Sequence, residues 1–533
     1  MTRTQHERMS SVDTAWLRMD SAVNAMVIMS VTVTETPILI ARFRRLVTDR
    51  FLCFPRFRQR PMQHALGASW VDDDAFDLDA HIHVVDLPTP AGHAELEALA
   101  GELASSRLDP DRPLWQMHLV ANYRGGSAWI MRIHHCYADG IAMIRVLLSM
   151  TEEHGATTAG SGARSQDRRP RRRPRPELLP LIDWIGQISS PAGDVLESAL
   201  SEGARLIETG LRQALHPAQA AVLARQAGGM VGELARVIAL PDDPSTAYRA
   251  GLSGHKLVAW ADPLPLEDVK TIGHALECTV NDVLMSTVAG ALGAWLREQG
   301  HDIGALTVRA TVPVNLRGAE PTLTLGNRFG LIFVDMPLGV RNPLRRLYAM
   351  HSTLSALKGS MQPPMTLALL GVLGLLPASL QAPAIELFSR KGTAVVSNVP
   401  GPTVPLYLCG QRISEMYFWV PQSGSIGLGV SVLTYAGRVH VGLIADRNLV
   451  PDPQRVVRLF APEFERLRQS VGAGALQTKT QGDGKQQGKT PENTRRKVAG
   501  RLAAKRKGRK RKGRKRKETP RKAARNTTRR RAD

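Results

Sequence analysis

Residues 134–140, with the sequence HHCYADG, constrain the fold of this 533-residue chain more than any other segment. Before them, apolar residues alternate at Trp129, Met131 and Ile133, as they do in a half-buried strand. After them, the segment IAMIRVLLSM repeats apolar residues at helical spacing. The segment is therefore predicted to form a strand-to-helix turn, a place where α/β proteins often present functional side chains.

The pattern HHxxxDG contains residues suited to proton transfer. A histidine has a pKa near neutrality, so it can take the proton of a hydroxyl group while the oxygen attacks a carbonyl. Because adjacent side chains of a strand point to opposite faces, one histidine can face a reaction cavity while the other packs or orients the turn. The motif as a whole favours His135 as the general base and His134 as the orienting residue. The same divergence argues against a metal site at this pair.

Asp139 and Gly140 complete the motif. We expect the carboxylate of Asp139 to have a structural role, in which it orders the loop by pairing with a distant arginine. Gly140 is expected to permit a tight reversal of the chain at the start of the helix.

Positive charge is concentrated in two segments. Of the formal net charge of +22, residues 495–533 supply +19, since they hold 21 Lys and Arg against Glu518 and Asp533. Residues 164–177 hold seven Arg against two acidic residues, which is +5. About −2 remains for the rest of the chain, so its function should not be inferred from the overall basic charge.

Composition divides the chain into four parts. Residues 1–154 form a first half that contains the motif, and residues 155–240 form an Arg- and Pro-rich linker with bridging helices. Residues 241–472 form a second half, and residues 473–533 are a Lys- and Arg-rich tail that is disordered by composition. In the second half, helices are predicted at 266–275 and 281–299, and strands at 255–261, 306–314, 331–336, 394–397, 426–434 and 438–445.

The four cysteines, Cys53, Cys136, Cys278 and Cys409, are far apart, which argues against a disulfide framework and a zinc site. The N-terminus lacks the apolar run of a signal peptide, so we expect a cytoplasmic protein. The most apolar stretch, residues 365–376, is shorter than the roughly 20 residues of a bilayer span. It is expected to be either a buried helix or a surface that dips into a lipid interface.

The HHxxxDG pattern resembles the signature of the coenzyme-A-dependent acyltransferase superfamily, which includes chloramphenicol acetyltransferase and peptide-synthetase condensation domains. Further segments narrow this resemblance: DRPLW (111–115), TVNDVLMS (279–286), VPVNLR (312–317), GNRFG (326–330) and SNVPGP (397–402). Together, over about residues 10–470, they are similar to the bacterial bifunctional wax ester synthase/diacylglycerol acyltransferase family. The opening segment VDTAWLRMDSAVNAMVIMSV, residues 12–31, resembles that family only loosely.

This resemblance implies an α/β (α+β) fold of two chloramphenicol-acetyltransferase-like halves with the active-site tunnel between them. It implies acyl transfer from acyl-CoA to diacylglycerol, which gives triacylglycerol, or to a long-chain alcohol, which gives a wax ester. Acyl-CoA would be a substrate, and no cofactor is expected. The residues implied to shape substrate binding are Pro113, Leu114, Trp115, Asn281 and Asp282.

Without the resemblance, Trp115 fits a core residue, and Asn281 with Asp282 fits a helix N-cap. The Asn281 amide is also a candidate donor to the oxyanion of a tetrahedral intermediate. These structural and functional roles are compatible with each other.

Two other interpretations stay open. A condensation-type acyltransferase would use another acceptor, such as a carrier protein, but the PLW, ND and SNVPGP segments argue against it. A nucleic-acid-binding or anionic-surface-binding protein would depend on the basic tail, whose binding should weaken steeply with salt. We expect the tail to be an addition to an enzyme, in contact with anionic lipid or nucleic acid. The enzyme itself is expected to be peripheral at the inner face of the cell membrane or at lipid inclusions.

Overall fold

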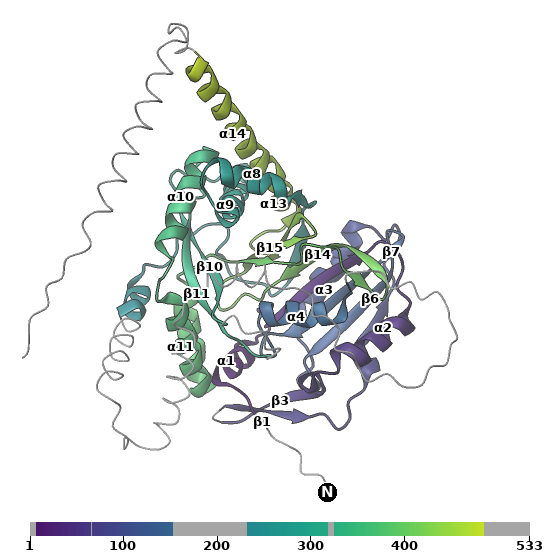
Figure 1. Ribbon diagram of the computed structural model, residues 1–533. Coiled ribbons are helices and arrows are strands. Elements are labelled where there is room, and N and C mark those ends of the chain that lie inside the picture. Colours follow the sequence, from purple (N-terminus) through teal and green to yellow (C-terminus); the bar gives the residue numbers. More distant parts are fainter. Residues whose placement is uncertain (1–6, 66, 153–231, 318–324, 484–533) are drawn as a thin grey trace, which may run out of the picture. The chain divides into compact units, whose positions relative to one another are not determined.

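The computed structural model describes residues 7–65, 67–152, 232–317 and 325–483 (Figure 1). The chain divides into two units, Met1–Val471 and Gly472–Asp533, and the sheets and the HHxxxDG motif all belong to the first. Most of the predicted linker, residues 155–231, and most of the predicted tail, residues 484–533, lie outside the described residues.

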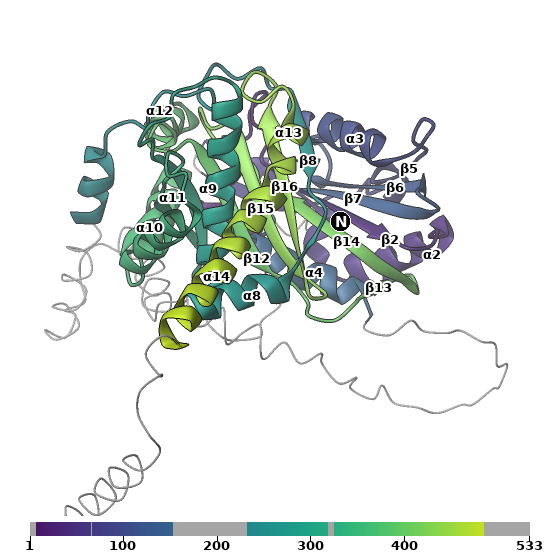
Figure 2. The ribbon, with the colours of Figure 1, turned by 90° about the horizontal axis from the view of Figure 1, so that it is seen from above.

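One large sheet carries the strand that leads into the motif. Its central strands β2 and β7 pair antiparallel. Strand β7 is buried along its whole length, so the prediction of a half-buried strand is wrong. Trp129, Met131 and Ile133 pack in one hydrophobic cluster, and the alternate residues Ala128 and Ile130 pack in another, so both faces of the strand are covered. Figure 2 shows strands β14, β2, β7 and β6 side by side. The strands, in spatial order, are β13 (Tyr407–Leu408), β14 (Gln411–Trp419), β2 (Val27–Thr34), β7 (Gly126–His134), β6 (Trp115–Tyr123) and β5 (Ile82–Val85).

A second large sheet is built by residues after the linker. Its hairpin turns at Ala436 and Gly437, whose φ angles of 46° and 77° are those of a two-residue turn that matches the twist of the strands. The strands, in spatial order, are β11 (Phe329–Met336), β10 (Val308–Asn315), β12 (Ala394–Pro400), β15 (Leu428–Tyr435), β16 (Arg438–Asp446) and β8 (Lys256–Trp260), and β9 (Leu264–Pro265) pairs with β16.

Helices cover both sheets, and a small sheet adjoins the first. Helix α9 begins with a capping box, in which Thr279 and Asp282 each satisfy a backbone N–H of the other. The small sheet has the order β1 (Glu7–Arg8), β4 (Ala68–Asp72) and β3 (Gln59–Gln63). In the described residues, a helix over 232–239 follows the linker. The labelled helices are α1 (Ser11–Met19), α2 (Ile40–Leu46), α3 (His93–Ser105), α4 (Gly140–Met150), α8 (Leu266–Ala275), α9 (Val280–Glu298), α10 (Pro343–Ala356), α11 (Gln362–Leu375), α12 (Ala378–Ser389), α13 (Pro453–Arg458) and α14 (Phe460–Asp483).

The sheets do not follow the predicted division of the chain at the linker. Strands β13 and β14 come from the second half of the sequence, yet they extend the first sheet, where β14 pairs with β2. A hydrophobic cluster also joins the sheets, since it contains Val31 and Trp419 from the first and Trp260 and Ile444 from the second. The two halves are therefore interlocked by strand exchange, which local sequence patterns do not reveal.

Most of the elements predicted for the second half are confirmed. Helix α8 has the predicted bounds, and the predicted strands correspond to β8, β10, β11, β12, β15 and β16 within a few residues. The start of the tail differs, because helix α14 runs past residue 472 to Asp483. A helix that has already formed gains a hydrogen bond with each added residue, so it can continue into a polar segment.

Helix α11 contains most of the apolar stretch at 365–376. One face of the helix packs against α1 and β11, and there Met365, Leu370 and Leu373 are buried (Figure 1). Its outer face leaves Val372 and Leu375 exposed. Among the described residues, no helix is both long enough and apolar enough to cross a membrane.

Candidate active site

The HHxxxDG motif forms the predicted strand-to-helix turn. Strand β7 ends at His134, and helix α4 begins at Gly140. The backbone N–H of His135 donates to the carbonyl oxygen of Met26 at 2.7 Å, and that of Tyr137 donates to His134 at 3.1 Å. Asp139 is the N-cap of α4, because its Oδ1 accepts from the N–H of Ala142 at 2.9 Å. The turn is thus fixed by a bond to Met26, by a bond within its own backbone and by the helix cap of Asp139, and its residues from 134 to 139 are buried.

Gly140 does not have the predicted role. Its φ angle lies outside the left-handed region, and a Cβ at this position would meet no atom within 4 Å. The tight reversal therefore does not require a glycine, and nothing in the structure explains its presence.

The imidazole of His135 is enclosed by aromatic rings. The indole of Trp16, from helix α1, stacks on it with ring centroids 4.2 Å apart, and the ring of Phe329 lies at 5.5 Å. Burial lowers the pKa of His135 to about 4, although its own backbone carbonyl, the charge of Asp139 and the side chain of Asn327 oppose this change. The imidazole is therefore neutral at neutral pH, the form in which a histidine can accept a proton.

His134 makes contacts different from those of His135. Its Nδ1 accepts from the N–H of Cys136 at 3.2 Å, and its Nε2 lies 4.0 Å from a carboxylate oxygen of Asp20. Burial lowers its pKa to about 4 as well, against the attraction of Asp20. The Nδ1 contact ties His134 to the turn, in agreement with the orienting role expected for it.

Asp139 pairs with a distant arginine, as the sequence suggested, and that arginine is Arg317 of the VPVNLR segment. Oδ2 of Asp139 accepts from Nε of Arg317 at 3.0 Å and from Nη2 at 2.9 Å, with both side chains buried. The same oxygen accepts from the N–H of Arg328 at 3.0 Å, and Arg317 also donates to the carbonyl of Gly326. The pair therefore links the motif to the second half of the sequence, and its many partners fit a structural role.

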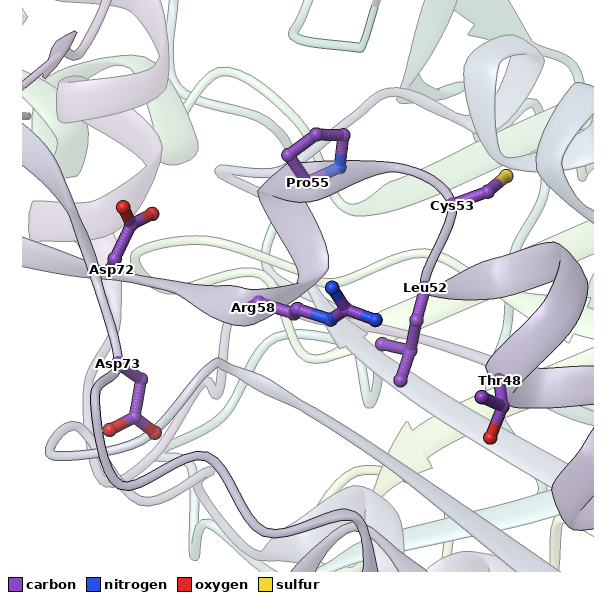
Figure 3. Close-up of a pocket in the computed structure, with 7 residues that line it drawn as sticks. All are labelled: Thr48, Leu52, Cys53, Pro55, Arg58, Asp72 and Asp73. Carbon is purple, nitrogen blue, oxygen red and sulfur yellow. The ribbon is translucent and has the colours of Figure 1, made fainter.

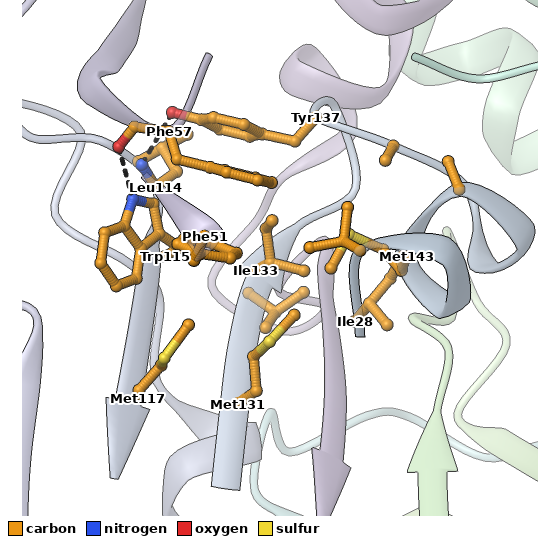
Figure 4. Close-up of a cluster of buried hydrophobic side chains, with 14 of the residues drawn as sticks. Ile28, Phe51, Phe57, Leu114, Trp115, Met117, Met131, Ile133, Tyr137 and Met143 are labelled. Atoms are coloured by element: carbon orange, nitrogen blue, oxygen red, sulfur yellow. Dashed lines mark hydrogen bonds between the residues drawn. The ribbon is translucent and has the colours of Figure 1, made fainter. Parts of the chain in front are cut away.

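The PLW segment lies against the motif (Figure 4). The N–H of Leu114 donates to the hydroxyl of Tyr137 at 3.0 Å, and the carbonyl of Leu114 accepts from the N–H of His134 at 2.9 Å. Trp115 is buried, as the core interpretation predicted, and its indole N–H donates to the carbonyl of Phe57 at 2.8 Å. Pro113 precedes these contacts and is buried as well. The segment thus supports the turn through the two hydrogen bonds of Leu114.

The ND segment occupies the first turn of α9, and the N-cap prediction needs a correction. The N-cap is Thr279, whereas Asp282 is the third residue of the helix and closes the capping box. Oδ1 of Asn281 accepts from the amide of Asn398 at 2.9 Å, which joins the ND and SNVPGP segments. The proposed role of Asn281 toward an oxyanion stays a prediction.

Asp282 also belongs to a cluster with Cys278 and His351, whose ligand atoms lie within 4.8 Å of one another. Its carboxylate already accepts from Nδ1 of His351 at 2.8 Å and from the N–H of Thr279 at 2.7 Å. The helix cap and the bond to His351 account for the position of Asp282 without a metal ion.

Sequence reasoning missed three residues at the turn, Asp13, Trp16 and Asn327. Asp13 and Trp16 are three residues apart on α1, which places them on the same face of that helix. Asn327 lies in the GNRFG segment, one of the segments that carry the family resemblance, but the sequence predicts no role for it. The spacing of Asp13 and Trp16 was a usable signal, but only the folded chain shows which face of α1 meets the motif.

A pocket of about 600 Å³ lies elsewhere in the first half (Figure 3). Its lining includes no residue of the HHxxxDG motif, and the charged side chains drawn there are Arg58, Asp72 and Asp73. It is therefore not assigned to the chemistry of His135. Its lining residues are Thr48, Leu52, Cys53, Pro55, Arg58, Asp72 and Asp73.

Comparison with protein families gives two matches that together span most of the described chain. Residues 9–284 match the family described as the wax ester synthase/diacylglycerol acyltransferase catalytic domain. Residues 325–468 match the WS/DGAT C-terminal domain.

Similar proteins carry related names. A Mycobacterium tuberculosis protein named as a diacylglycerol O-acyltransferase, tgs1, is 29% identical over 423 residues, which cover 77% of this chain and 83% of the relative. A second protein of that organism with the same activity in its name, tgs2, is 27% identical over 438 residues, covering 80% of this chain and 90% of the relative.

Two solved structures share the fold. The wax ester synthase/diacylglycerol acyltransferase from Marinobacter aquaeolei VT8 has a TM-score of 0.60 at 20% identity, covering 87% of this chain and 100% of that chain. The first condensation domain of the calcium-dependent antibiotic synthetase has a TM-score of 0.54 at 15% identity, covering 88% of this chain and 96% of that chain. The predicted fold class is thereby confirmed, whereas the tunnel between the halves stays a prediction.

Proposed function

Because the chain belongs to the wax ester synthase/diacylglycerol acyltransferase family, we propose that His135 is the general base of its acyl transfer reaction. The chain is an acyltransferase that acts on diacylglycerol or an alcohol. The observation that carries the proposal for His135 is the position of its imidazole, which is buried against Trp16 in the turn that follows β7.

The proposed reaction needs only the acceptor alcohol, acyl-CoA and His135, and every proton and leaving group is accounted for. The hydroxyl of the acceptor gives its proton to Nε2 of His135 while its oxygen forms a bond to the thioester carbonyl carbon of acyl-CoA. The tetrahedral intermediate then collapses, the carbon–sulfur bond breaks, and the leaving thiolate of coenzyme A takes the proton from His135. Nδ1 of His135 is buried without a hydrogen-bond partner among the described residues, which leaves Nε2 as the nitrogen for this task.

The test is an assay of the purified protein with palmitoyl-CoA and either hexadecanol or a diacylglycerol. Release of coenzyme A and formation of ester are followed for the wild type, for His135→Ala and for His440→Phe. His440 is a matched control, because it is also a buried histidine with a pKa lowered to about 4, on strand β16. We expect ester formation to collapse in His135→Ala only.

Two other outcomes of this assay would contradict the proposed base or the proposed acceptor. If His135→Ala keeps wild-type activity, the general-base role is wrong. If neither lipid acceptor yields ester although the protein binds acyl-CoA, a condensation-type acceptor on a carrier protein becomes the better explanation.

For the location of the reaction, we propose that the outer face of α11 and the start of α12 contact a lipid surface. Val372, Leu375 and Leu380 are 52%, 45% and 58% exposed, which is unusual for large apolar side chains on adjoining helices. Helix α11 packs on α1, which carries Trp16, so this face lies one helix away from His135.

The apolar face is tested by flotation with vesicles that contain anionic lipid. We expect Val372→Asp/Leu375→Asp to weaken association, because each charge disfavours insertion into the interface. Val84→Asp is the control. Val84 is also an exposed apolar residue, at 51%, but it lies on β5 at the edge of the first sheet and not on α11 or α12. Equal loss in both variants would show that general surface charge, and not this face, determines binding.

For the basic tail, we propose binding to anionic lipid. Residues 505–517 read KRKGRKRKGRKRK, and each basic residue near an anionic surface contributes about 1 kcal/mol. Deletion of residues 495–533 should lower vesicle retention in a salt-dependent way. If retention on DNA falls and retention on vesicles does not, the tail is a nucleic-acid-binding segment instead.

A further inference from the structure

Helices α9 and α10 pack against each other in the second half of the chain (Figure 1). Nε of Arg346, on α10, donates to the carbonyl oxygen of Ser286 on α9 at 2.9 Å. Further along α10, Nδ1 of His351 bonds to Oδ2 of Asp282 at 2.8 Å, near the start of α9. The two helices are therefore antiparallel, and α10 presents His351 to the first turn of α9.

The turn before α9 brings a cysteine to the same place. The backbone N–H of Cys278 donates to the carbonyl of Gly273, in the last turns of α8, at 2.8 Å. A Cβ on Gly273 would lie 2.7 Å from the carbonyl oxygen of Cys278, so the two segments are in close contact. The thiol itself donates to the carbonyl of Leu276 at 3.4 Å, which is a weak bond. The backbone thus fixes the position of Cys278, and a stronger ligand can replace the partner of its thiol.

Three types of metal ligand meet at this point. The ligand atoms of Cys278, Asp282 and His351 lie within 4.8 Å of one another. Zinc accepts a thiolate, an imidazole and a carboxylate, whereas magnesium and calcium prefer oxygen ligands. In a tetrahedral zinc site with bonds of about 2.0–2.3 Å, two ligands are roughly 3.5 Å apart, so the outermost pair must approach by about 1 Å. The spacing of the four cysteines could not reveal such a site, because it uses one of them and a histidine 69 residues after Asp282.

We propose that Cys278, Asp282 and His351 bind a divalent cation of the zinc class, which ties α10 to the start of α9. On binding, the thiol of Cys278 loses its proton to solvent. Nδ1 of His351 binds the ion while the ring keeps its proton on Nε2. The side chain of His351 is 36% exposed, so water can reach the ion and supply a fourth ligand. This role is separate from the acyl transfer reaction and does not depend on His135.

The charges at the site suit a divalent ion. Asp282 is 2% exposed, and its ion-pair partner is the imidazole of His351. Burial, together with the charge of Asp282, raises the pKa of the Cys278 thiol. A bound Zn²⁺ balances one carboxylate and one thiolate, so it offsets the cost of burying two anions near each other.

The surroundings of Asp282 match those of a ligating carboxylate. Its Oδ2 accepts from the backbone N–H of Thr279 at 2.7 Å, and a hydrogen bond of this kind orients a metal ligand. The carboxylate has a second oxygen, Oδ1, which can take the ion while that bond is kept. The preceding residue, Asn281, accepts from the amide of Asn398 at 2.9 Å. An ion at Asp282 therefore steadies the turn that joins the ND and SNVPGP segments.

The first test uses Co²⁺ as a spectroscopic probe for the zinc class. Full-length protein without an affinity tag is freed of metal with a chelator and titrated with Co²⁺. We expect a single equivalent to give the intense visible bands of tetrahedral Co²⁺ and a thiolate-to-cobalt charge-transfer band, and Zn²⁺ to remove both. Cys278→Ser should lose the charge-transfer band, whereas Cys53→Ser, at an exposed cysteine outside the group, should keep it. If the wild type shows no such band, or if Cys278→Ser retains it, the site is wrong.

The second test measures the melting temperature with added metal. We expect Zn²⁺ to raise it in a concentration-dependent way, because an ion that binds the folded state stabilises that state, and we expect Mg²⁺ to have no effect. His351→Gln should abolish the increase. His301→Gln, at an exposed histidine beyond the other end of α9, should retain it. Equal increases in the two variants would overturn the proposal.

His351→Gln also protects the cobalt experiment against misfolding. Its side chain is partly exposed, so the variant should fold even if Cys278→Ser does not. We expect His351→Gln to weaken Co²⁺ binding at least tenfold, because one of three protein ligands is lost. A wild-type affinity for Co²⁺ in folded His351→Gln would show that this histidine is not a ligand and would overturn the proposed site.

Discussion

The imidazole of His135 and the indole of Trp16 lie nearly parallel, with 16° between the planes and 4.2 Å between the ring centroids. Trp16 is buried on helix α1, and its ring also stacks on Phe329 at 5.6 Å. The proposed base therefore has one face covered by a rigid aromatic surface. Such a contact excludes water and restricts the ring to one orientation.

Replacement of Trp16 by Leu should lower kcat on the order of tenfold, because the imidazole gains freedom to tilt away from the productive geometry. Trp16→Phe, which keeps an aromatic face, should recover part of the loss. Steady-state kinetics with palmitoyl-CoA and hexadecanol measure both variants. Equal activity of Trp16→Leu and wild type would mean that the stacked ring does not orient His135.

Two glycines of α11, Gly371 and Gly374, face Ser11 of α1, and replacing each by Ala tests how closely the two helices must pack. A Cβ at Gly374 would lie 1.7 Å from the carbonyl oxygen of Ser11, so Gly374→Ala must push the helices apart. A Cβ at Gly371, one turn earlier, would lie 3.5 Å from the hydroxyl oxygen of Ser11, which is ordinary contact. We expect Gly374→Ala to lower both melting temperature and activity, because α1 carries Trp16.

Gly371→Ala should instead raise stability by about 0.5–1 kcal/mol, as expected for Gly→Ala inside a helix with free space. Urea unfolding and the ester assay are applied to both variants. A loss of stability in Gly374→Ala without loss of activity would show that the position of α1 does not matter for catalysis.

The local features of the site could be predicted from the sequence. The alternation at Trp129, Met131 and Ile133 and the helical spacing after Gly140 placed the motif correctly, because both patterns depend on neighbours in the chain. The pairing of Asp139 with an arginine could be expected as well. Which arginine it is could not, since Arg317 is 178 residues away and many arginines were available.

The contacts between segments far apart in the sequence could not be predicted. Asp13 and Asn327 are 314 residues apart, and neither stands in a pattern that suggests the other. Strand β14 pairs with β2, and this pairing depends on tertiary packing that leaves no periodic trace in either segment. Long-range polar contacts are therefore where the structure adds most to the predicted site.

The buried pair of Asp139 and Arg317 should be important for stability. Arg317→Met would leave the carboxylate of Asp139 buried without its main cation, and the loss of one partner of such a pair costs about 3–5 kcal/mol. Urea denaturation measures this change. Asp139→Asn/Arg317→Met should recover part of the loss, because both charges are then absent.

An exposed ion pair provides the control for that experiment. Arg455 bonds to Glu298 at 2.8 Å, with side chains 52% and 34% exposed, so Arg455→Met should change stability little. If Arg317→Met is no more destabilising than Arg455→Met, the link between the motif and the second half is not a determinant of folding.

Buried histidines should make the protein sensitive to mild acid. Burial lowers the pKa of His134, His135 and His440 to about 4, whereas in the unfolded chain the pKa is near 6.5. Between these values the unfolded state binds more protons, so stability falls as pH decreases from about 6.5 to about 4. Asp13 and Asp243 have the opposite sign, because burial raises the pKa of both carboxyl groups, that of Asp13 to about 6. The histidines outweigh them, since burial also lowers the pKa of His118, to about 3.

The melting temperature should therefore decrease steadily from pH 7 to pH 5, and His440→Phe should reduce this decrease. His440 lies among the rings of Tyr417 and Tyr435, and neither of its nitrogens has a hydrogen-bond partner in the described residues, so a phenyl ring fits the site. Differential scanning calorimetry at pH 7.5 should give similar values for wild type and variant, with the variant more stable at pH 5. Identical pH profiles would mean that His440 is already protonated in the folded protein, or that it is accessible to water.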